Sequence, residues 1–388
     1  MNIKITPRKL AGEIAAITSK SAAHRALICA FLCKEKPEIK IENTSKDIEA
    51  TLACLEAMKN KSAPLINCGE SGSTFRFLLP LAAHLCENAK FIGEGRLPQR
   101  PIEDLLDALR ANGVNFSSEK LPFTVSGKLQ GGKFVLPGNV SSQFVSGLLF
   151  VLPLLNGDSE IKLTTPLESK SYADMTVDML RKFGIEIIEK NNYYEVKCNQ
   201  IYKSPKIIEV EKDWSNAAFF LSANALGADI KITGLDINSV QGDKEIVSIL
   251  KRFMESEDLR GVGIDVSEIP DLLPILAVVA AFAKGETVLY NAARLRLKES
   301  DRLSAVSEML KIFGAEVEEK SDSLIISGGK LKGGIVDSAG DHRIVMSAAI
   351  CGCFCEGETI IKGAEAVEKS YPNFFEDFAK LGGKADVI

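Results

Sequence analysis

Apolar residues in this chain fall into two kinds of segment, and each kind predicts a different helix. In the first kind, apolar residues recur every three or four positions, as at Leu303, Val306 and Leu310, and a glycine follows at Gly314. This spacing is typical of an amphipathic helix, and glycine often follows a helix end. In the second kind, as in residues 272–283, almost every residue is apolar, which predicts a helix buried on all sides.

Both kinds of helix recur at intervals of roughly 65 residues, a period that indicates a repeated unit. The unit reads as strand, buried helix, strand, amphipathic helix and hairpin. We predict buried helices at residues 26–32, 77–85, 144–155, 217–226, 272–283 and 344–354, and amphipathic helices around Leu55, Leu109, Leu180, Leu250, Leu310 and Phe378. The sequence thus predicts an α/β protein of six units, most simply three per domain. The alternative is a single irregular α/β domain.

The composition favours a globular protein with small-molecule partners. With 388 residues, 46% of them hydrophobic, the chain can build two sizeable cores. The net charge of -5 lacks the basic excess of nucleic-acid binders, and apolar runs of about 12 residues are too short to cross a bilayer. We therefore expect neither nucleic acid nor a membrane as a partner. Since the first residues resemble neither a signal nor a transit peptide, we expect a cytoplasmic protein.

The nine cysteines lie mostly in apolar segments, as Cys29 and Cys33 do. Reduced thiols packed in a core fit this distribution. Cys351, Cys353 and Cys355 alternate, but neither a histidine nor a second cysteine pair follows them at the spacing of a zinc site. We therefore expect no metal.

The starts of the buried helices are rich in polar residues. Free N–H groups and the positive end of the helix dipole make such starts suitable for phosphate or carboxylate. Ser, Thr and Asp are also ordinary caps, and capping alone explains Ser45, Thr176 and Asp213. It does not explain Arg76 or Arg343, because a cation in the first turn opposes the dipole unless an anion lies nearby. The residues at these starts include Ser19, Lys20, Ser21, Arg25, Ser71, Gly72, Ser73, Ser141, Ser142, Gln143, Asp271 and Asp341.

Further cations lie in loops. Arg294 and Arg296 could equally be a solvated charge run or part of a site. Arg100 and Arg302 each lie at or near a predicted helix start, which favours a site for an anion. Arginine offers a planar fork for carboxylate and phosphate, whereas lysine offers a point charge that can also move a proton. The number of cations predicts substrates that together carry several negative charges.

These motifs, in this order and spacing from residue 3 to about 381, closely resemble the EPSP synthases, the 3-phosphoshikimate 1-carboxyvinyltransferases. The resemblance implies a two-domain inside-out α/β barrel, the enolpyruvyl transferase fold, with three βαβαββ repeats per domain. It implies one domain at residues 19–211, mainly for shikimate 3-phosphate, a second at 1–18 plus 212–388, and an active site in the interdomain cleft. The motifs are Lys20-Ser21 with Arg25, residues 72–76, 96–101, 141–143, 169–172, 269–271, 298–302 and 341–343, and Lys369.

The reaction implied by the resemblance transfers the enolpyruvyl group of phosphoenolpyruvate to the 5-hydroxyl of shikimate 3-phosphate. By the same resemblance, shikimate 3-phosphate is held by Lys20, Ser21, Arg25, Ser141, Ser142, Gln143, Ser169, Tyr172, Asp271 and Lys298. Phosphoenolpyruvate is held by Lys20, Gly72, Arg100, Gln143, Arg302, Arg343 and Lys369, with Arg96 as a further candidate. These two substrates are the only partners that we expect, for a monomer without a cofactor.

The chemistry of addition and elimination suggests roles for three residues. Asp271 is the expected base at the attacking hydroxyl, kept ionised by the cations around it. Glu299 and Lys20 are both candidates for delivering a proton. Gly72 has no side chain and leaves room for an inhibitor, so we expect competition by glyphosate.

The chain departs from the family in a few places. The segments after Met58 and Phe253 are short, which predicts two units without their hairpins. Glu70 and Arg294 stand where family members often have Asn, so neither role can be transferred; Arg294 could alter the charge near the shikimate phosphate.

Two other functions fit parts of the pattern. A UDP-N-acetylglucosamine enolpyruvyl transferase would share the fold and phosphoenolpyruvate, but its cleft loop usually carries a cysteine, and residues 93–101 contain none. A noncatalytic anion-binding repeat protein would have no reason to keep Asp271 and Glu299 among the cations.

Overall fold

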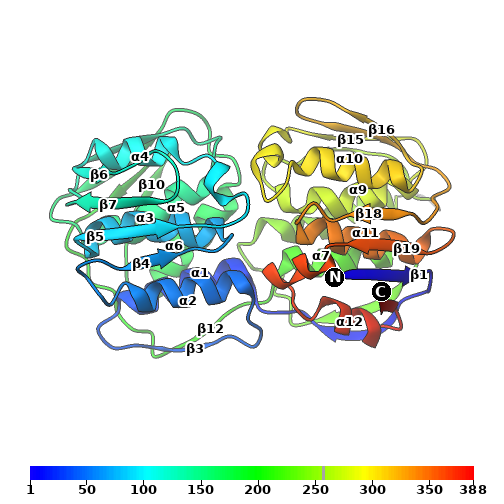
Figure 1. The fold of residues 1–388 in the computed structure, drawn as a ribbon, viewed down its shortest axis with the longest axis horizontal. Coiled ribbons are helices and arrows are strands. Elements are labelled where there is room, and N and C mark those ends of the chain that lie inside the picture. The colour runs from blue at the N-terminus through cyan, green and yellow to red at the C-terminus, as the bar shows by residue number, and fades with distance from the viewer. Residues whose placement is uncertain (256–257) are drawn as a thin grey trace. The chain divides into compact units, whose positions relative to one another are not determined.

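The computed structural model describes residues 1–255 and 258–388, and its chain divides into two compact units (Figure 1). Unit 1 comprises Met1–Ile17 and Lys212–Ile388, and unit 2 comprises Thr18–Glu211. The chain thus passes between the units twice.

Four complete repeats show the predicted order of strand, buried helix, strand, amphipathic helix and hairpin. The first of them in unit 2 consists of β4 (Leu65–Asn67), α3 (Gly72–Leu85), β5 (Asn88–Ile92), α4 (Glu103–Arg110), β6 (Val114–Phe116) and β7 (Phe123–Gly127). The second consists of β8 (Lys133–Leu136), α5 (Ser142–Val151), β9 (Ser159–Leu163), α6 (Lys170–Lys182), β10 (Ile187–Lys190) and β11 (Tyr193–Val196). Each repeat forms one four-stranded sheet, such as β4-β5-β7-β6. The first two strands are parallel, because a helix crosses between them, and the hairpin is antiparallel.

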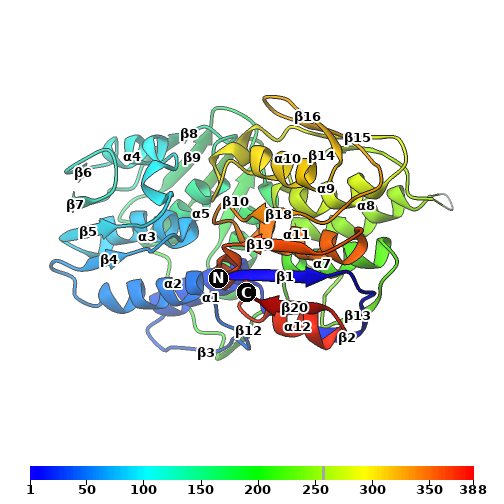
Figure 2. The same ribbon diagram turned by 45° about the vertical axis from the view of Figure 1, so that its right-hand side comes forward.

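Unit 1 holds the other two complete repeats. One consists of β14 (Gly263–Asp265), α9 (Leu273–Phe282), β15 (Glu286–Tyr290), α10 (Arg302–Ile312), β16 (Glu316–Glu319) and β17 (Leu324–Ser327). The other consists of β18 (Ile335–Asp337), α11 (His342–Phe354), β19 (Thr359–Lys362), α12 (Phe374–Lys380), β20 (Lys384–Val387) and β1 (Asn2–Thr6). The last sheet has the order β18-β19-β1-β20, so the first strand of the chain completes the last repeat. Figure 2 shows β1 and β20 side by side near the two chain ends.

The remaining two repeats are reduced, as the short segments predicted. They are β2 (Ala11–Ala15), α7 (Trp214–Ala225), β13 (Asp229–Thr233), α8 (Ile246–Phe253) in unit 1, and β12 (Ile207–Glu209), α1 (Lys20–Leu32), β3 (Glu38–Lys40), α2 (Lys46–Ala57) in unit 2. Each has a two-stranded parallel sheet, β13-β2 or β12-β3. No hairpin strand lies between α2 and β4, and none lies among the described residues between α8 and β14. Strand β2 is the last element of unit 1 before the chain passes to unit 2, and β12 is the last element of unit 2 before the chain returns. Each of them pairs with a strand of the unit that the chain is leaving, β13 or β3.

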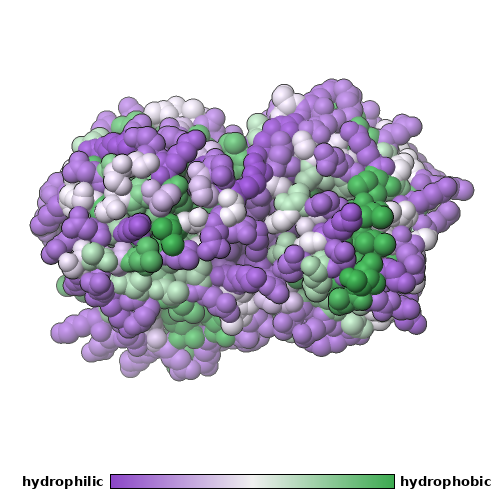
Figure 3. Space-filling view, viewed as in Figure 1, coloured by the Kyte–Doolittle hydropathy of each residue, from purple (hydrophilic) through white to green (hydrophobic). Residues whose placement is uncertain are grey.

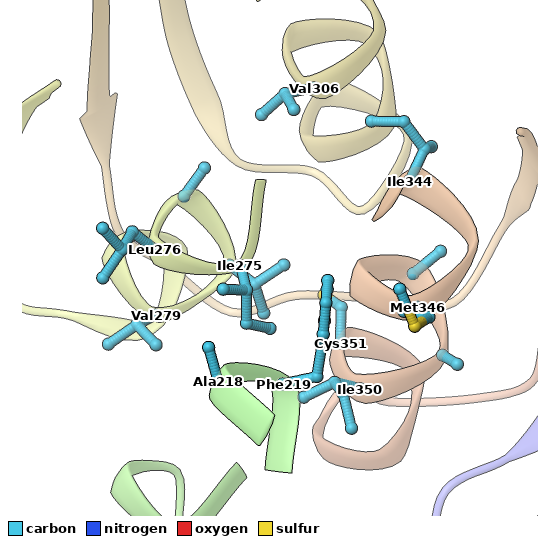
Figure 4. Close-up of a cluster of buried hydrophobic side chains, with 14 of the residues drawn as sticks. Ala218, Phe219, Ile275, Leu276, Val279, Val306, Ile344, Met346, Ile350 and Cys351 are labelled. Carbon is cyan, nitrogen blue, oxygen red and sulfur yellow. The ribbon is translucent and has the colours of Figure 1, made fainter. Parts of the chain in front are cut away.

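The buried helices form the core of each unit. In unit 1, α7, α9 and α11 pack against one another, and Figure 4 shows Phe219, Ile275 and Ile350 pointing into the space between them. All nine residues from Leu273 to Ala281 are buried. A helix that is apolar all round requires such cover on every side. Unit 2 has a separate core around α1, α3 and α5.

The face seen in Figure 3 is mostly hydrophilic, and its apolar groups gather in a few patches. Exposed apolar residues include Leu65, Val135 and Ile335, each on the first strand of its repeat. None of the helices in the described part of the chain combines the length and apolar character needed to cross a membrane.

The glycine that follows an amphipathic helix has the predicted role. Gly113 and Gly314 have φ of 95° and 89°, a region that residues with a Cβ rarely occupy. The periodic pattern therefore located both the amphipathic helices and their ends.

We expect the packing of α7 against α9 and α11 to dominate the stability of unit 1. Phe219 is fully buried, so Phe219→Ala should lower the free energy of unfolding by about 3–5 kcal/mol. Ile237→Ala, at a residue that is 63% exposed in the same unit, should change it by less than about 0.5 kcal/mol. Denaturant unfolding of both variants measures the difference, and equal losses would contradict this account of the core.

Candidate active site

The polar starts of the buried helices are N-caps in the structure. Ser19, Ser71 and Ser141 accept a hydrogen bond from a backbone amide in the first turn of α1, α3 and α5. Asp213 and Asp341 do the same for α7 and α11. Helix α9 instead follows the 3-10 turn Pro270–Leu272, which contains Asp271. The helix starts were therefore placed correctly.

Capping does not explain every hydroxyl that we assigned to it. Thr176 lies inside α6, where its hydroxyl accepts a hydrogen bond from Arg25 Nε at 2.8 Å. Ser45 precedes α2 but makes no side-chain cap hydrogen bond. The prediction was wrong for Thr176, whereas Ser45 is the N-cap residue of α2 but does not use its hydroxyl as a cap, because periodicity does not show which way a hydroxyl points. It was correct for Asp213, which accepts from Asn216 N.

Unit 1 gathers several predicted site residues around the Asp271 carboxylate. One carboxylate oxygen accepts from Arg302 Nη1 and the other from Arg343 Nη2, both at 2.9 Å. Arg302 is 1% exposed and begins α10, whereas Arg343 lies in the first turn of α11. The 3-10 turn before α9 and the starts of α10 and α11 therefore meet at one carboxylate.

Arg302 is held by two further carboxylates. Its Nη2 donates to Glu299 Oε2 at 2.8 Å, and its Nε donates to Asp341 Oδ2 at 2.9 Å. Asp341 is fully buried and also accepts from the backbone amide of Arg343. One buried carboxylate thus contacts two of the arginines that we expect to hold phosphoenolpyruvate, Arg302 through its guanidinium and Arg343 through its backbone amide.

The cluster sets the charge of its members. Burial alone would raise the pKa of the Asp271 carboxyl, but the surrounding cations, Arg343 foremost, hold that pKa well below its usual range. Burial would lower the pKa of Arg302, but Asp341 and Glu299 raise it above its usual value. Burial lowers the pKa of Lys298 to about 8, with Asp271 opposing this effect. Asp271 is therefore ionised, as expected, while Lys298 titrates closer to neutrality than an exposed lysine.

The other cations of unit 1 have different surroundings. Lys369 Nζ donates to Gly340 O at 2.8 Å, next to the cap of α11. Arg296 pairs with Asp301 and Glu319 and donates to backbone carbonyls, so it has a structural role. Arg294 donates to Ser267 O at 2.8 Å.

In unit 2, the start of α1 contacts α2 and α6. Lys20 Nζ pairs with Asp47 Oδ2 at 2.7 Å, and both side chains are largely buried. Arg25 donates to the carbonyls of Ser21 and Tyr172 as well as to Thr176. Ser169, the N-cap of α6, has a left-handed φ of 53°.

The start of α5 is joined to α3 through Gln143. Its carbonyl oxygen accepts from Arg76 Nη1 at 2.8 Å, and its amide nitrogen donates to Ser73 Oγ at 2.9 Å. Arg76 also donates to Pro101 O, next to Arg100. Arg76 therefore fixes the orientation of the Gln143 amide and the end of the loop that carries Arg100.

Gly72 lies directly under Arg100. A Cβ at Gly72 would lie 2.5 Å from Arg100 Nη1 and 2.9 Å from its Cζ. The space beside Gly72 is thus occupied by a guanidinium group rather than being open, and any ligand there must contact Arg100. Glu70 folds against the same loop, since a Cβ at Gly95 would lie 2.7 Å from its carboxyl carbon.

The structure brings most predicted residues together within each unit. In unit 1, these are Asp271, Glu299, Arg302 and Arg343 with Lys298 nearby, and Lys369 joins through Gly340. In unit 2, Arg25 contacts Ser21 and Tyr172, and Gln143 contacts Ser73, next to Gly72 and Arg100. Lys20, Ser141, Ser142 and Ser169 lie at the starts of α1, α5 and α6. Arg96 is exposed at the start of a 3-10 turn. The described residues contain no cluster of His, Cys, Asp or Glu suited to a metal ion.

Sequence reasoning missed Asp47, which pairs with Lys20. It lies in the first turn of α2, where an acidic residue is ordinary, so its only signal would have been the need of Lys20 for a counter-ion.

Solved structures identify the class of fold. The EPSP synthase of Acinetobacter baumannii superposes with a TM-score of 0.83 and 26% identity, covering 100% of both chains. The enolpyruvyl transferase NikO of Streptomyces tendae superposes with a TM-score of 0.77 and 17% identity, covering 99% of this chain and 98% of that one, a likeness of fold alone. The chain has the two-domain enolpyruvyl transferase fold, which confirms the predicted fold class.

Sequence comparison identifies the family. The family model of EPSP synthase (3-phosphoshikimate 1-carboxyvinyltransferase) matches residues 5–378. The 3-phosphoshikimate 1-carboxyvinyltransferase of Clostridium kluyveri is 46% identical, covering 99% of this chain and 98% of that protein. The chain therefore belongs to the EPSP synthase family, in agreement with the resemblance of its motifs.

We expect the buried Asp341 carboxylate to be essential for stability. Asp341→Asn keeps a cap of similar shape but removes one of the negative charges that balance buried Arg302. It should therefore lower the free energy of unfolding by about 3–5 kcal/mol. Asp301→Asn is a matched control, since Asp301 caps α10 and pairs with Arg296 but is 40% exposed. The control substitution should lower the free energy of unfolding by less than about 1 kcal/mol. Denaturant unfolding compares the two, and a similar small loss in both would refute the role of Asp341.

Proposed function

We propose that the protein transfers the enolpyruvyl group of phosphoenolpyruvate to the 5-hydroxyl of shikimate 3-phosphate and releases phosphate, the step before chorismate in the shikimate pathway. The observation that carries this proposal is the cluster of unit 1, in which Asp271 and Glu299 are held among cations. Membership of the family supports the choice of substrates.

The proposed reaction is an addition followed by an elimination. Asp271 accepts the proton of the 5-hydroxyl as the hydroxyl oxygen attacks C2 of phosphoenolpyruvate, while C3 gains a proton from Glu299 or Lys20. C3 then loses a proton as the bond from C2 to the phosphate oxygen breaks. Phosphate leaves and the enolpyruvyl double bond is restored.

The charges of the cluster suit this sequence. The cations that hold the pKa of Asp271 low are Arg343 and Arg302, proposed to hold phosphoenolpyruvate, and Lys298, proposed to hold shikimate 3-phosphate. When substrate anions offset these cations, the pKa of Asp271 should rise, making the carboxylate a stronger base only when substrate is bound. Arg302 and Arg343 also stabilise the charge that develops on the leaving phosphate.

Both proposed binding sets draw on both units. Shikimate 3-phosphate would contact Ser21 and Arg25 of unit 2 and Lys298 of unit 1, and phosphoenolpyruvate would contact Arg100 of unit 2 and Arg343 of unit 1. We therefore propose that the reaction requires residues of both units to contact the same pair of substrates. We also propose that the protein is a monomer and works in the cytoplasm.

Replacing the proposed base tests the function directly. Mixed with both substrates, the wild-type protein should release phosphate, and Asp271→Asn should release it at least about 100-fold more slowly, since general-base catalysis contributes on this scale. Asp386→Asn, on β20, is the control and should be unaffected. Equal rates for wild type and Asp271→Asn would refute the role of the base. No release with shikimate 3-phosphate, but release with UDP-N-acetylglucosamine, would identify the sister transferase. No release with either acceptor would favour a binding protein.

The low pKa of Lys298 predicts a pH dependence. Lys298 is cationic below pH 8 and loses its proton as the pH rises through about 8. The value of kcat/KM for shikimate 3-phosphate should therefore fall by about tenfold between pH 7 and pH 9, because this ratio reports the free enzyme. Lys298→Arg keeps its charge over this range and should give a flatter profile. Identical profiles would show that Lys298 does not hold the phosphate.

Glyphosate should compete with phosphoenolpyruvate for the site beside Gly72. Because the added methyl group of Gly72→Ala would meet the Arg100 guanidinium, that side chain must move, and the variant should bind both anions more weakly. Initial rates at varied phosphoenolpyruvate and glyphosate measure both effects. Wild-type rates unchanged at high glyphosate would exclude competition.

A further inference from the structure

A buried chain of hydrogen bonds links the three helices α1, α2 and α3 of unit 2. His24 Nδ1 lies 2.7 Å from Thr51 Oγ1, which lies 2.6 Å from Thr74 Oγ1. Thr74 Oγ1 donates to Ser71 Oγ at 2.7 Å. All four side chains are at most 1% exposed. The chain ends at Ser71, the N-cap of α3 and the neighbour of Gly72.

The protons of this chain can be assigned one by one. Thr74 has a single hydroxyl proton and donates it to Ser71 Oγ at 2.7 Å, since the carbonyl oxygen of Asp47, at 3.4 Å, lies beyond the usual length of an O–H···O hydrogen bond. No proton of Thr74 then remains for Thr51, so Thr51 donates to Thr74. The proton of Thr51 is then used, so His24 Nδ1 must donate to Thr51.

The other ring nitrogen of the histidine agrees with this direction. His24 Nε2 is buried and has no hydrogen-bond partner among the described residues. A buried acceptor without a partner is more often tolerated than a buried N–H without one, which favours the proton on Nδ1. Burial, together with Lys20 and Arg25, lowers the pKa of His24 well below its usual value, so the ring is neutral.

The hydroxyl proton of Ser71 is therefore left without an acceptor in the described protein. Ser71 Oγ accepts from the hydroxyl and from the amide of Thr74, so both of its recorded hydrogen bonds use its oxygen as an acceptor. The next residue, Gly72, lies under the Arg100 guanidinium. A buried O–H donor, the first amides of α3 and a cation thus adjoin one another, and together they suit an anion.

We propose that Ser71 is a further phosphoenolpyruvate-binding residue, whose hydroxyl donates to the anion held by Gly72 and Arg100. The proposal rests on the proposed function. The chain from His24 through Thr51 and Thr74 acts as a positioning element, since it directs the Ser71 proton away from the helix. Ser71 thereby serves two partners at once, as acceptor for the amide of Thr74 and as donor for the substrate.

Three variants separate donation from capping. Ser71→Ala removes the hydroxyl and the cap, Ser71→Gly removes the hydroxyl but keeps most of the capping strength, and Ser71→Thr keeps both. A hydrogen bond to a charged group predicts that KM for phosphoenolpyruvate rises about tenfold in Ser71→Ala and Ser71→Gly alike. KM for shikimate 3-phosphate should change by less than about twofold, and Ser71→Thr should resemble wild type. A wild-type KM in Ser71→Gly would overturn the proposal, because the effect in Ser71→Ala would then be lost capping.

A second measurement does not depend on activity. The chain has three histidines, so the nitrogen-15 spectrum of histidine-labelled protein can be assigned with His84→Gln and His342→Gln. His24 should be neutral with its proton on Nδ1 throughout pH 6 to 8. A proton on Nε2 would reverse the chain and overturn the proposal. If the wild-type protein releases no phosphate, the proposed function fails; if it is active but KM for phosphoenolpyruvate is unchanged in Ser71→Ala, only this inference fails.

Discussion

A helix that is apolar on every side can exist only where other elements cover all of it. Helix α9 is such a helix, and α7, α10, α11 and strands β15 and β17 provide its cover. Only the ends of these helices can carry polar chemistry without opening the core. The location of the candidate site at helix starts is therefore a consequence of how the core is built, and the same repeat supplies both.

The chain provides its own counter-ions for the cations at those starts. Asp271 lies between Arg302 and Arg343, Asp341 supports Arg302 from inside, and Asp47 pairs with Lys20. A cation in the first turn of a helix would otherwise oppose the dipole. The carboxylates offset that cost and hold the arginines in place, so an anionic substrate meets donors that are already oriented.

The sequence predicted the elements that repeat and missed those that depend on a partner far along the chain. The motifs identified the family, and two segments that are short for that family predicted the two reduced repeats, while periodicity located the helices and their glycine ends. It did not predict that β1 would complete the last sheet, because a short strand carries no mark of its neighbour. Likewise, Thr176 looked like a cap because its partner Arg25 lies 151 residues away. The binding roles of the individual residues stay predictions.

The position of β1 between β19 and β20 has a consequence for the order in which the protein can fold during synthesis. Unit 2 is one continuous stretch, so all of its strands and helices have been made once residue 211 has left the ribosome. Unit 1 cannot close its last sheet until β19 and β20 have been made, because β1 pairs with both of them. Ile3 and Ile5, both buried in the folded unit, therefore have no place in that sheet until more than 380 further residues have been added.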